Sequence, residues 1–415
     1  MKPTVLIATT SRWFPTARLA MALSRAGCIV HAVCPSGHPL SRMNSVQHDY
    51  TFQGLMPLQS FSIAIAEARP DFIVPGDDRA TSHLHRLYER ERRHGQSGQW
   101  VCELIERSLG AAESFPMVYA RTAFIDMARQ EGIRAPKTEV LEHLGDVRKW
   151  IARTGLPTVL KANGTSGGEG VRVVHTLEEA ERAFRDLQAP PLLARAVKRA
   201  LIDRDKSLVW SSLLRHRSVV NAQAFVPGRE ATSTVACWKG AVLASLHFEV
   251  VNKRSSAGPS SVLRLIENAE MSAAAEKLVR RLGLSGIHGF DFMIEEHTRN
   301  AHLIEINPRA TQVGHLALGP GHDLPAALYS AVSGEPLRPA PKVTENEIIT
   351  LFPQELMRDP ASEFLTSGYH DVPWEEPELL RACIRKTGKP KLFDSRPDSV
   401  PALSTVGVPR SGPLQ

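Results

Sequence analysis

The sequence predicts a mixed α/β and α+β protein, in which a parallel α/β unit is followed by a larger, strand-rich part. Near the N-terminus, short apolar runs alternate with amphipathic stretches, which is typical of parallel strands joined by helices. From residue 219 to 251, and again from 288 to 306, strand-forming residues dominate and short turns separate them, which indicates a strand-rich part. The length of 415 residues favours two or three domains.

Composition excludes several classes of protein. Hydrophobic residues make up 42% and charged residues 23%, which is globular composition. The net charge of +6 suits a polyanionic nucleotide as well as nucleic acid. Because no Lys/Arg cluster with interleaved aromatic residues stands out, we expect no nucleic-acid partner.

No segment reaches the roughly 20 apolar residues that a membrane span needs, and the first apolar run, at 4–9, is too short for a signal peptide. We therefore expect no membrane partner and a cytoplasmic location. Five scattered cysteines without a C-x-x-C pattern argue against disulfides and structural zinc, and we expect them to be buried: Cys28, Cys34, Cys102, Cys237 and Cys383. A homodimer is expected only from the general frequency of two-fold assemblies.

The N-terminal unit is read as strands at 4–8, 29–33 and 71–74, with a helix at 16–25 after the first strand. No G-x-G-x-x-G follows the first strand, so the unit is Rossmann-like without a dinucleotide fingerprint. The third strand ends in Pro-Gly-Asp-Asp at 75–78. Asp77 and Asp78 either face a substrate at the carboxyl end of the sheet or cap the next helix, and the sequence favours neither.

The remaining elements follow in chain order. Helices are expected at 119–130, 145–154, 177–187, 271–282 and 324–332, and strands at 157–161, 171–174, within 219–251, at 288–295 and at 301–306. The tail after about 340 is proline-rich and contains a possible short helix at 377–384.

A glycine-rich turn follows a lysine at the end of a predicted strand. Lys161 precedes the turn NGTSGGEG at 163–170, which contains Gly167 and Gly168, and another strand follows. Glycine lets backbone N–H groups approach a phosphate chain, and the lysine can reach an α- or β-phosphate. In a P-loop the lysine instead follows the glycines and a helix comes next. The pattern therefore predicts either a hairpin that covers phosphates or a plain glycine-rich hairpin.

The segment QAFVPGRE at 223–230 leads from a strand into a Pro-Gly turn. Such an edge can read adenine, with polar contacts from Gln223 and Val226 and with Phe225 against the face of the base. Glu230 lies seven residues after Gln223 and could accept both ribose hydroxyls. Taken alone, the segment is more simply a strand that ends in a turn.

The most specific pattern is GFDFMIE at 289–295 followed by HLIEINPR at 302–309. Glu305 and Asn307 are two residues apart and project from one face of a strand, next to a strand that carries Asp291. Oxygen ligands of this kind suit Mg²⁺, with Mn²⁺ as a possible substitute. Arg309 continues on that face and could steady a transferring phosphoryl group.

Three further residues are weaker candidates. His288 and His315 flank the metal strands, and each is more simply a packed histidine than a base. Arg254 lies in a basic loop at 253–261, where it either holds a substrate carboxylate in a bidentate way or is solvated.

Taken in order, these motifs resemble the ATP-grasp superfamily, which includes D-alanine–D-alanine ligase, biotin carboxylase and carbamoyl-phosphate synthase. The resemblance runs from about residue 4 to about residue 335. It implies an N-terminal Rossmann-like parallel α/β domain at 1–115 and an ATP-grasp domain at 116–335, with a small lid subdomain at about 140–222 and a C-terminal antiparallel-sheet ATP-binding subdomain. A partly irregular C-terminal extension follows at 336–415.

The resemblance also implies roles for individual residues. Lys161 matches the lysine on the ATP phosphates, and the 164–170 turn matches the phosphate lid. Gln223 and Val226 match the adenine hinge, and Glu230 matches the ribose glutamate. The expected magnesium ligands are Asp291, Glu305 and Asn307, and Arg309 matches an arginine of the carboxylase and synthase branches.

Two positions depart from the family pattern. Arg121 stands where the family usually has a phosphate-binding lysine, and arginine keeps the charge but changes the geometry. Biotin carboxylases follow the arginine with a Glu-His pair, whereas Val313-Gly314-His315 stands here.

The resemblance implies a ligase that uses ATP and Mg²⁺ to join a small carboxylic acid to an amine through an acyl phosphate. Lys161, Arg309 and Arg254 would act in catalysis, and Arg121 would contact the nucleotide. Two alternatives stay open: an ATP-dependent carboxylase or carbamoyl-phosphate-type enzyme, and a nucleotide-binding regulator that has lost catalysis.

Overall fold

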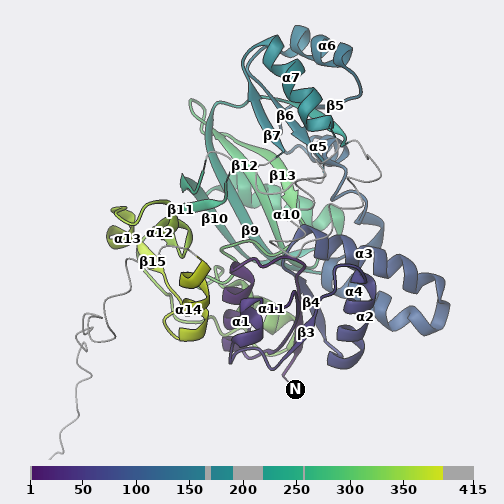
Figure 1. Ribbon diagram of the computed structural model, residues 1–415, viewed down its shortest axis with the longest axis vertical. Coiled ribbons are helices and arrows are strands. Elements are labelled where there is room, and N and C mark those ends of the chain that lie inside the picture. The colour runs from purple at the N-terminus through teal and green to yellow at the C-terminus, as the bar shows by residue number, and fades with distance from the viewer. Residues whose placement is uncertain (1, 164–169, 190–217, 256–257, 387–415) are drawn as a thin grey trace, which may run out of the picture.

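The structure of the 415-residue chain is a computed structural model that describes residues 2–163, 170–189, 218–255 and 258–386. These residues form three sheets, arranged as an N-terminal unit at the bottom of Figure 1, a large central sheet and a small lobe at the top. The predicted combination of a parallel α/β unit with antiparallel sheets is confirmed.

The N-terminal unit contains a four-stranded parallel sheet with the order β3-β2-β1-β4. Its strands are β1 (Thr4–Ala8), β2 (Ile29–Cys34), β3 (His48–Thr51) and β4 (Phe72–Pro75), and its helices are α1 (Pro15–Arg25), α2 (Pro57–Ala68), α3 (Asp78–Arg93) and α4 (Gln99–Leu109). Val5 and Ile7 pack in the core that contains α1, whereas Leu6 and Ala8 pack with α2, α3 and α4. A strand that is buried on both faces explains the continuous apolar run TVLIA.

The small lobe contains an antiparallel sheet with the order β5-β8-β6-β7. Its strands are β5 (Thr138–Leu141), β6 (Thr158–Ala162), β7 (Val171–Val174) and β8 (Val220–Ala224), covered by α6 (Leu144–Thr154) and α7 (Leu177–Gln188). Trp150, Leu160 and Phe184 lie in its core. Strands β6 and β7 pair antiparallel, as predicted for the two strands that flank the glycine-rich turn.

The central sheet has seven strands in the order β13-β12-β9-β10-β11-β14-β15. They are β9 (Gly228–Trp238), β10 (Ala241–Lys253), β11 (Ser260–Leu265), β12 (Gly286–Glu295), β13 (Ala301–Asn307), β14 (Ile348–Leu351) and β15 (Tyr369–Asp371). All neighbouring pairs are antiparallel except β14–β15. Helices α5 (Arg121–Gln130) and α10 (Ala269–Leu282) pack in a core with one face of this sheet, and α11 (Leu324–Ser333) packs with α1 in the core of the other face.

The C-terminal extension joins the central sheet as far as the structure describes it. Beyond the predicted boundary at 335, β14 and β15 extend the sheet, together with α12 (Gln354–Arg358), α13 (Phe364–Ser367) and α14 (Pro377–Lys386), which confirms the predicted helix at 377–384. Asp371 of β15 accepts a hydrogen bond from the Arg18 guanidinium of α1 and lies 2.7 Å from His315 Nε2. All three side chains are buried. The domain boundaries themselves stay predictions.

The described residues bear on two expectations from the sequence, which concern the cysteines and membrane-spanning helices. All five cysteines are free thiols, and four of them are buried. Burial raises the pKa of Cys28 and of Cys34 to about 12, so these thiols behave as small apolar groups. In the described ranges, no helix combines the length and the apolar character needed to cross a bilayer.

Candidate functional site

Two carboxylates face each other on neighbouring strands of the central sheet. Asp291 of β12 is the direct register partner of Glu305 of β13. Asn307 Nδ2 donates a hydrogen bond to Asp291 Oδ2 at 2.9 Å, and Thr232 Oγ1 of β9 donates one to Asp291 Oδ1 at 3.0 Å. The three residues predicted to bind metal therefore lie together.

The electrostatics of this pair favour a bound cation. Burial raises the pKa of Asp291 to about 6, and the charge of Glu305 adds to the rise, while hydrogen bonds from Asn307 and Thr232 oppose it. Two carboxylates that repel each other at a partly buried position are stabilised by a divalent ion between them. In the described part of the chain no group of three His, Cys, Asp or Glu side chains is arranged for a metal. A hard cation here would depend on the Asn307 amide and on oxygens from outside the protein, which is how Mg²⁺ is commonly held.

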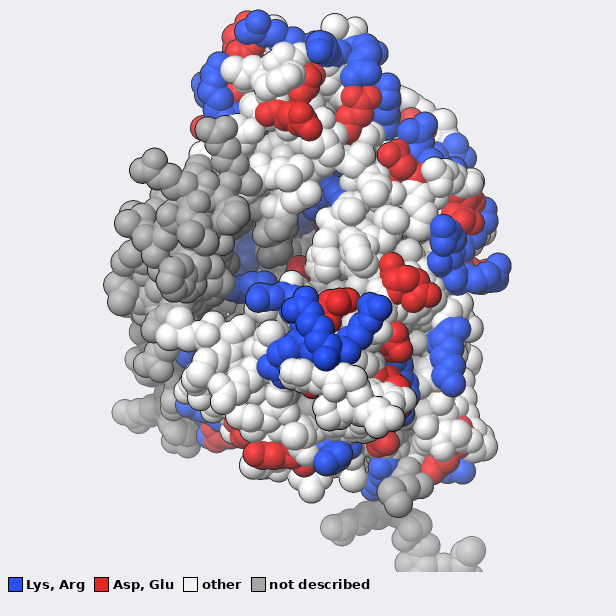
Figure 2. Space-filling model, turned by 90° about the vertical axis from the view of Figure 1, so that its right-hand side faces the viewer, with Lys and Arg blue, Asp and Glu red and all other residues white. Residues whose placement is uncertain are grey.

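Lys161 brings the small lobe to the same place. It lies near the end of β6 and is 5% exposed. Burial lowers the pKa of its ammonium to about 8; Glu305 and Asp291 oppose the fall, and Arg121 adds to it. These charges act on Lys161 only because the two sheets converge, so the lysine and the acidic pair share one site. Figure 2 shows a recess beneath the upper lobe with basic side chains visible inside it.

Arg121 links the first turn of α5 to the acidic pair. Its Nη2 lies 2.8 Å from Glu305 Oε2. Its Nη1 is buried and has no hydrogen-bond partner among the described residues. The residue predicted to contact phosphate therefore pairs with a predicted metal ligand and keeps one donor available.

Arg309 connects the acidic strands to the N-terminal unit. Its Nε donates to Asp78 Oδ1 at 3.2 Å, and its Nη2 donates to Asn307 Oδ1 at 3.3 Å. Burial opposes the charge of this guanidinium, but Asp78 and Asp291 together raise the pKa of Arg309 above its ordinary value. Asp78, which the sequence left undecided, thus faces the site.

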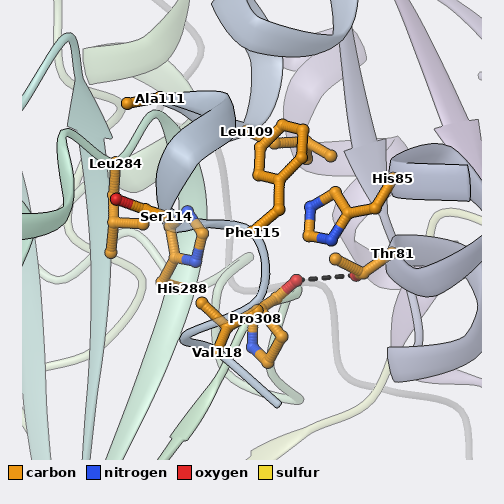
Figure 3. A pocket seen from close by; sticks show the side chains of 10 residues that line it. All are labelled: Thr81, His85, Leu109, Ala111, Ser114, Phe115, Val118, Leu284, His288 and Pro308. Atoms are coloured by element: carbon orange, nitrogen blue, oxygen red, sulfur yellow. Dashed lines mark hydrogen bonds between the residues drawn. The ribbon is translucent and has the colours of Figure 1, made fainter. Parts of the chain in front are cut away.

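The chain around Arg309 docks directly on the carboxyl end of β4. Ala310 N donates to Pro75 O at 2.9 Å, and Thr81 Oγ1 of α3 donates to Pro308 O at 2.7 Å (Figure 3). Asp77, the other acid of that turn, accepts a hydrogen bond from Ala80 N and caps α3. The N-terminal sheet edge and the acidic strands therefore form one continuous surface.

The linker between β8 and β9 joins the two sheets that carry Lys161 and Asp291. Phe225 is 38% exposed there, and no backbone hydrogen bond connects Val226 to another described residue. The Gln223 side chain is buried within the small sheet and donates to Thr138 Oγ1 at 3.1 Å. The predicted adenine contacts are therefore free at Phe225 and Val226, whereas the Gln223 amide is already engaged.

Glu230 and Arg254 form none of the contacts described above, although the charge of Glu230 acts on Lys161. Glu230 lies at the start of β9, is half exposed and pairs with Lys253 Nζ at 2.6 Å. Arg254 has an exposed side chain in the turn after β10, and its backbone N–H donates to Pro259 O. Gly167 and Gly168 lie outside the described residues. The structure does not bring Arg254 into contact with the acidic pair.

A family model described as an ATP-grasp domain matches residues 201–313, which include Asp291, Glu305, Asn307 and Arg309. The chain contains an ATP-grasp domain. The carbamoyl phosphate synthase large chain of Methanoculleus marisnigri is 25% identical over 276 residues, which cover 63% of this chain and 23% of that protein. This ATP-grasp chain thus spans about a quarter of the length of that relative.

Solved structures share the ATP-grasp fold at low sequence identity. Biotin carboxylase from Campylobacter jejuni, solved with a β,γ-ATP ligand, has a TM-score of 0.58 at 14% identity, covering 84% of this chain and 74% of that chain. N5-carboxyaminoimidazole synthetase from Staphylococcus aureus, solved with ADP, has a TM-score of 0.56 at 14% identity, covering 82% and 80%. At such identities the likeness establishes the fold.

The two histidines beside the ATP-grasp strands are structural. His288 Nε2 lies 2.7 Å from Ser285 O, and burial lowers the pKa of His288 to about 4. It lines a small pocket together with His85, which stacks on Phe115 (Figure 3). Burial likewise lowers the pKa of His315, although its partner Asp371 opposes the fall. Neither histidine is poised to act as a base toward the acidic pair.

Sequence reasoning missed two supporting groups. Thr232 bonds Asp291 from the adjacent strand β9, and nothing in a strand-forming threonine marks it for that position. Asn221 of β8 accepts from Thr122 Oγ1 at 2.8 Å and donates to Asn163 Oδ1 at 2.8 Å, which ties α5 to the β6–β7 hairpin. The position of Asn221 beside Lys161 in register is a signal only once the strand pairing is known.

Proposed function

We propose that this protein is an ADP-forming ligase that activates a small carboxylic acid with ATP and transfers it to an amine. The observation that carries the proposal is the convergence of Lys161 from the small lobe with Asp291 and Glu305 from the central sheet. A buried lysine opposite two partly buried carboxylates suits a triphosphate with its divalent ions.

Each part of the nucleotide has a matching group. Lys161 and the unpaired Nη1 of Arg121 would bind the phosphates. The open backbone of Val226 would read the adenine edge and Phe225 would lie against its face, while Glu230 would accept the ribose hydroxyls. Asp291, Glu305 and Asn307 would hold magnesium, which supplies charge neutralisation of the phosphates when bound.

The reaction follows from this arrangement in two steps. An oxygen of the substrate carboxylate attacks the γ-phosphorus, the bond to the bridging oxygen breaks, and ADP leaves. Lys161, Arg121 and Arg309 would stabilise the charge that spreads over the transferring group. The amine nitrogen then attacks the acyl carbon, phosphate leaves and the amine loses a proton. The turn that contains Gly167 and Gly168 would exclude water from the acyl phosphate.

We assign substrate binding and nucleotide binding to different predicted domains. The domain at 1–115 and the extension at 336–415 would shape the acid and amine sites, and the domain at 116–335, with its lid at about 140–222, would hold the nucleotide. Arg254 would contribute only if its loop at 253–261 moves toward the site.

A second candidate is bicarbonate-dependent chemistry, because the similar proteins include a carbamoyl phosphate synthase and biotin carboxylase. ADP release that depends on bicarbonate and needs no amine would favour it. Nucleotide binding without turnover on any substrate would instead favour a regulator that has lost catalysis.

The test is an ADP-release screen of the purified protein against small carboxylic acids and amines, singly and in pairs. We expect ADP only when an acid and an amine are both present. Glu305→Gln and Lys161→Ala should abolish release. Glu276→Gln and Lys137→Ala, which change exposed side chains outside the site, should leave it unchanged. Near-normal turnover in either site variant would contradict the proposal.

A further inference from the structure

The loop after β1 is held rigidly by one carboxylate. Asp77 accepts hydrogen bonds from Thr10 N at 2.6 Å, Thr10 Oγ1 at 2.8 Å, Thr9 Oγ1 at 2.8 Å and Ser11 N at 3.1 Å. Burial opposes ionisation, but these bonds lower the pKa of Asp77 below its ordinary value. The loop conformation is therefore fixed by Asp77, whose carboxylate oxygens are already hydrogen-bonded to the loop.

Arg12 is the next residue of this loop. Its Nη2 donates to Ser36 O, in the loop after β2, at 2.5 Å. The guanidinium therefore lies across the carboxyl ends of two parallel strands, β1 and β2. In open α/β sheets this edge is where ligands bind.

The Arg12 guanidinium lacks a counter-charge. Among the described residues it forms no ion pair, and its Nε is buried without a hydrogen-bond partner. The two acids at the end of β4 have other partners, because Asp77 is engaged by Thr9, Thr10 and Ser11 and Asp78 pairs with Arg309. The helix that follows, α1, has no side-chain cap and no acidic residue in its first turn. A half-buried cation in such surroundings is stabilised by an anion from outside the protein.

The place of Arg12 connects it to the proposed chemistry. Asp77 holds the Arg12 loop, and its neighbour Asp78 holds Arg309 at 3.2 Å. Two adjacent residues at the end of β4 therefore hold Arg309 and the loop residues that precede Arg12. An acid whose reacting carboxylate lies near Arg309 would extend toward Arg12 along this edge.

We propose that Arg12 binds a second anionic group of the acid substrate, so that the substrate is a dicarboxylate or a phosphorylated carboxylic acid. This inference rests on the proposed ligase function and adds the charge class of the substrate. Arginine suits the role because its planar fork can donate two parallel hydrogen bonds to a carboxylate or phosphate. The Arg12 bond to Ser36 fixes the orientation of the fork before the substrate arrives.

The experiment compares matched acids with the wild-type protein and three variants. Succinate, glutarate and O-phosphoserine are paired with succinamate, glutaramate and serine, which keep the reacting carboxylate but lack the second charge. ADP release is measured with a mixture of amines. Arg12→Gln removes the charge, Arg12→Lys keeps it without the fork, and Arg42→Gln removes a charge from an exposed residue of the same unit.

We expect turnover only with the doubly charged acids. Arg12→Gln should raise KM for them by about 10- to 100-fold, the loss expected for a charge-assisted pair of hydrogen bonds, with a much smaller change in kcat. Arg12→Lys should recover part of the loss, and Arg42→Gln should behave like the wild type. Equal turnover of the singly charged acids, or equal effects of the Arg12 and Arg42 changes, would overturn the inference.

A thermal-shift measurement without nucleotide separates this inference from the proposed function. Inorganic phosphate and glutarate should raise Tm of the wild type and of Arg42→Gln but not of Arg12→Gln. Such a shift without ADP release from any acid would sustain the anion site while contradicting the ligase function. ADP release with no shift that depends on Arg12 would sustain the ligase and overturn the anion site.

Discussion

Replacing Lys161 with methionine should stabilise the protein while removing nucleotide binding. Methionine keeps most of the side-chain length and apolar contact but has no charge. Lys161 is 5% exposed and its ammonium forms no hydrogen bond or ion pair with another described residue. In the absence of nucleotide the buried charge therefore destabilises the folded protein, and we expect its role to be the binding of phosphate.

The magnitude follows from the pKa of the ammonium. Burial lowers it from 10.5 to about 8, after the opposing effects of Glu305 and Asp291 are included. Since one pKa unit corresponds to about 1.4 kcal/mol, the charged form destabilises the folded state by at most about 3.5 kcal/mol near neutral pH. We expect Lys161→Met to raise the free energy of unfolding by about 1–3 kcal/mol at pH 7.

The sign of the pH dependence gives an internal check. Between pH 8 and 10.5 the unfolded chain keeps the Lys161 proton and the folded chain has lost it, so the stability of the wild type rises with pH in this window. Lys161→Met should lack that rise, and the difference between the two proteins should shrink toward pH 10. Urea denaturation at several pH values, with and without Mg-ATP, measures both effects. A variant that is less stable than the wild type at pH 7, or that is still stabilised by Mg-ATP, would refute the reasoning.

Three further predictions concern other parts of the molecule. Asp371→Ala leaves Arg18 and His315 buried without their carboxylate and should lower the free energy of unfolding, measured by urea denaturation, by about 3–5 kcal/mol. Glu375→Ala, which breaks an exposed pair with Arg25, should lower it by at most about 1 kcal/mol. Similar losses in the two variants would contradict this account. Arg121→Gln removes the cation that lies 2.8 Å from Glu305. Binding of Mn²⁺ without nucleotide, measured by electron paramagnetic resonance, should therefore become tighter. Weaker binding would argue against a metal role for Glu305. Burial opposes the ionisation of Glu355, but hydrogen bonds from Arg358 and Ser362 lower its pKa to about 2. The ionised carboxylate should therefore stabilise the fold above about pH 4.5, and this contribution should be lost as the pH falls toward 2. The free energy of unfolding of Glu355→Gln should depend less on pH in the same range.

The sequence predicted those parts of the fold that depend on local patterns. Strands β1 and β4 are continuous, mostly buried apolar runs, and β2 is apolar except at His31. Strands β12 and β13 carry apolar side chains between their functional residues. Strand β3 was not predicted, because HDYT is short and largely exposed. Strands β14 and β15 were not predicted either, since each of them is short and pairs with a strand that lies far away in the sequence or across a long connection.

The candidate site was predictable where its residues sit on one strand or on a turn next to it. The spacing of Glu305 and Asn307 already implied a shared face. The partner that completes the site comes from elsewhere, because Asp78 lies 231 positions from Arg309; the buried pair that anchors the C-terminal extension, Arg18 and Asp371, is 353 positions apart. No local pattern encodes such pairs, because they depend on how the sheets pack. The engagement of Gln223 with Thr138 was hidden for the same reason.

The central claim is that Lys161 and the acidic pair bind opposite sides of one nucleotide. A crystal structure of the protein with Mg²⁺ and a non-hydrolysable ATP analogue tests it most directly. We expect the phosphates to lie between Lys161 and Asp291, with metal bound by Asp291, Glu305 and Asn307 and with the base against the 225–227 linker. A nucleotide bound elsewhere, or one whose phosphates contact neither Lys161 nor the acidic pair, would contradict the account.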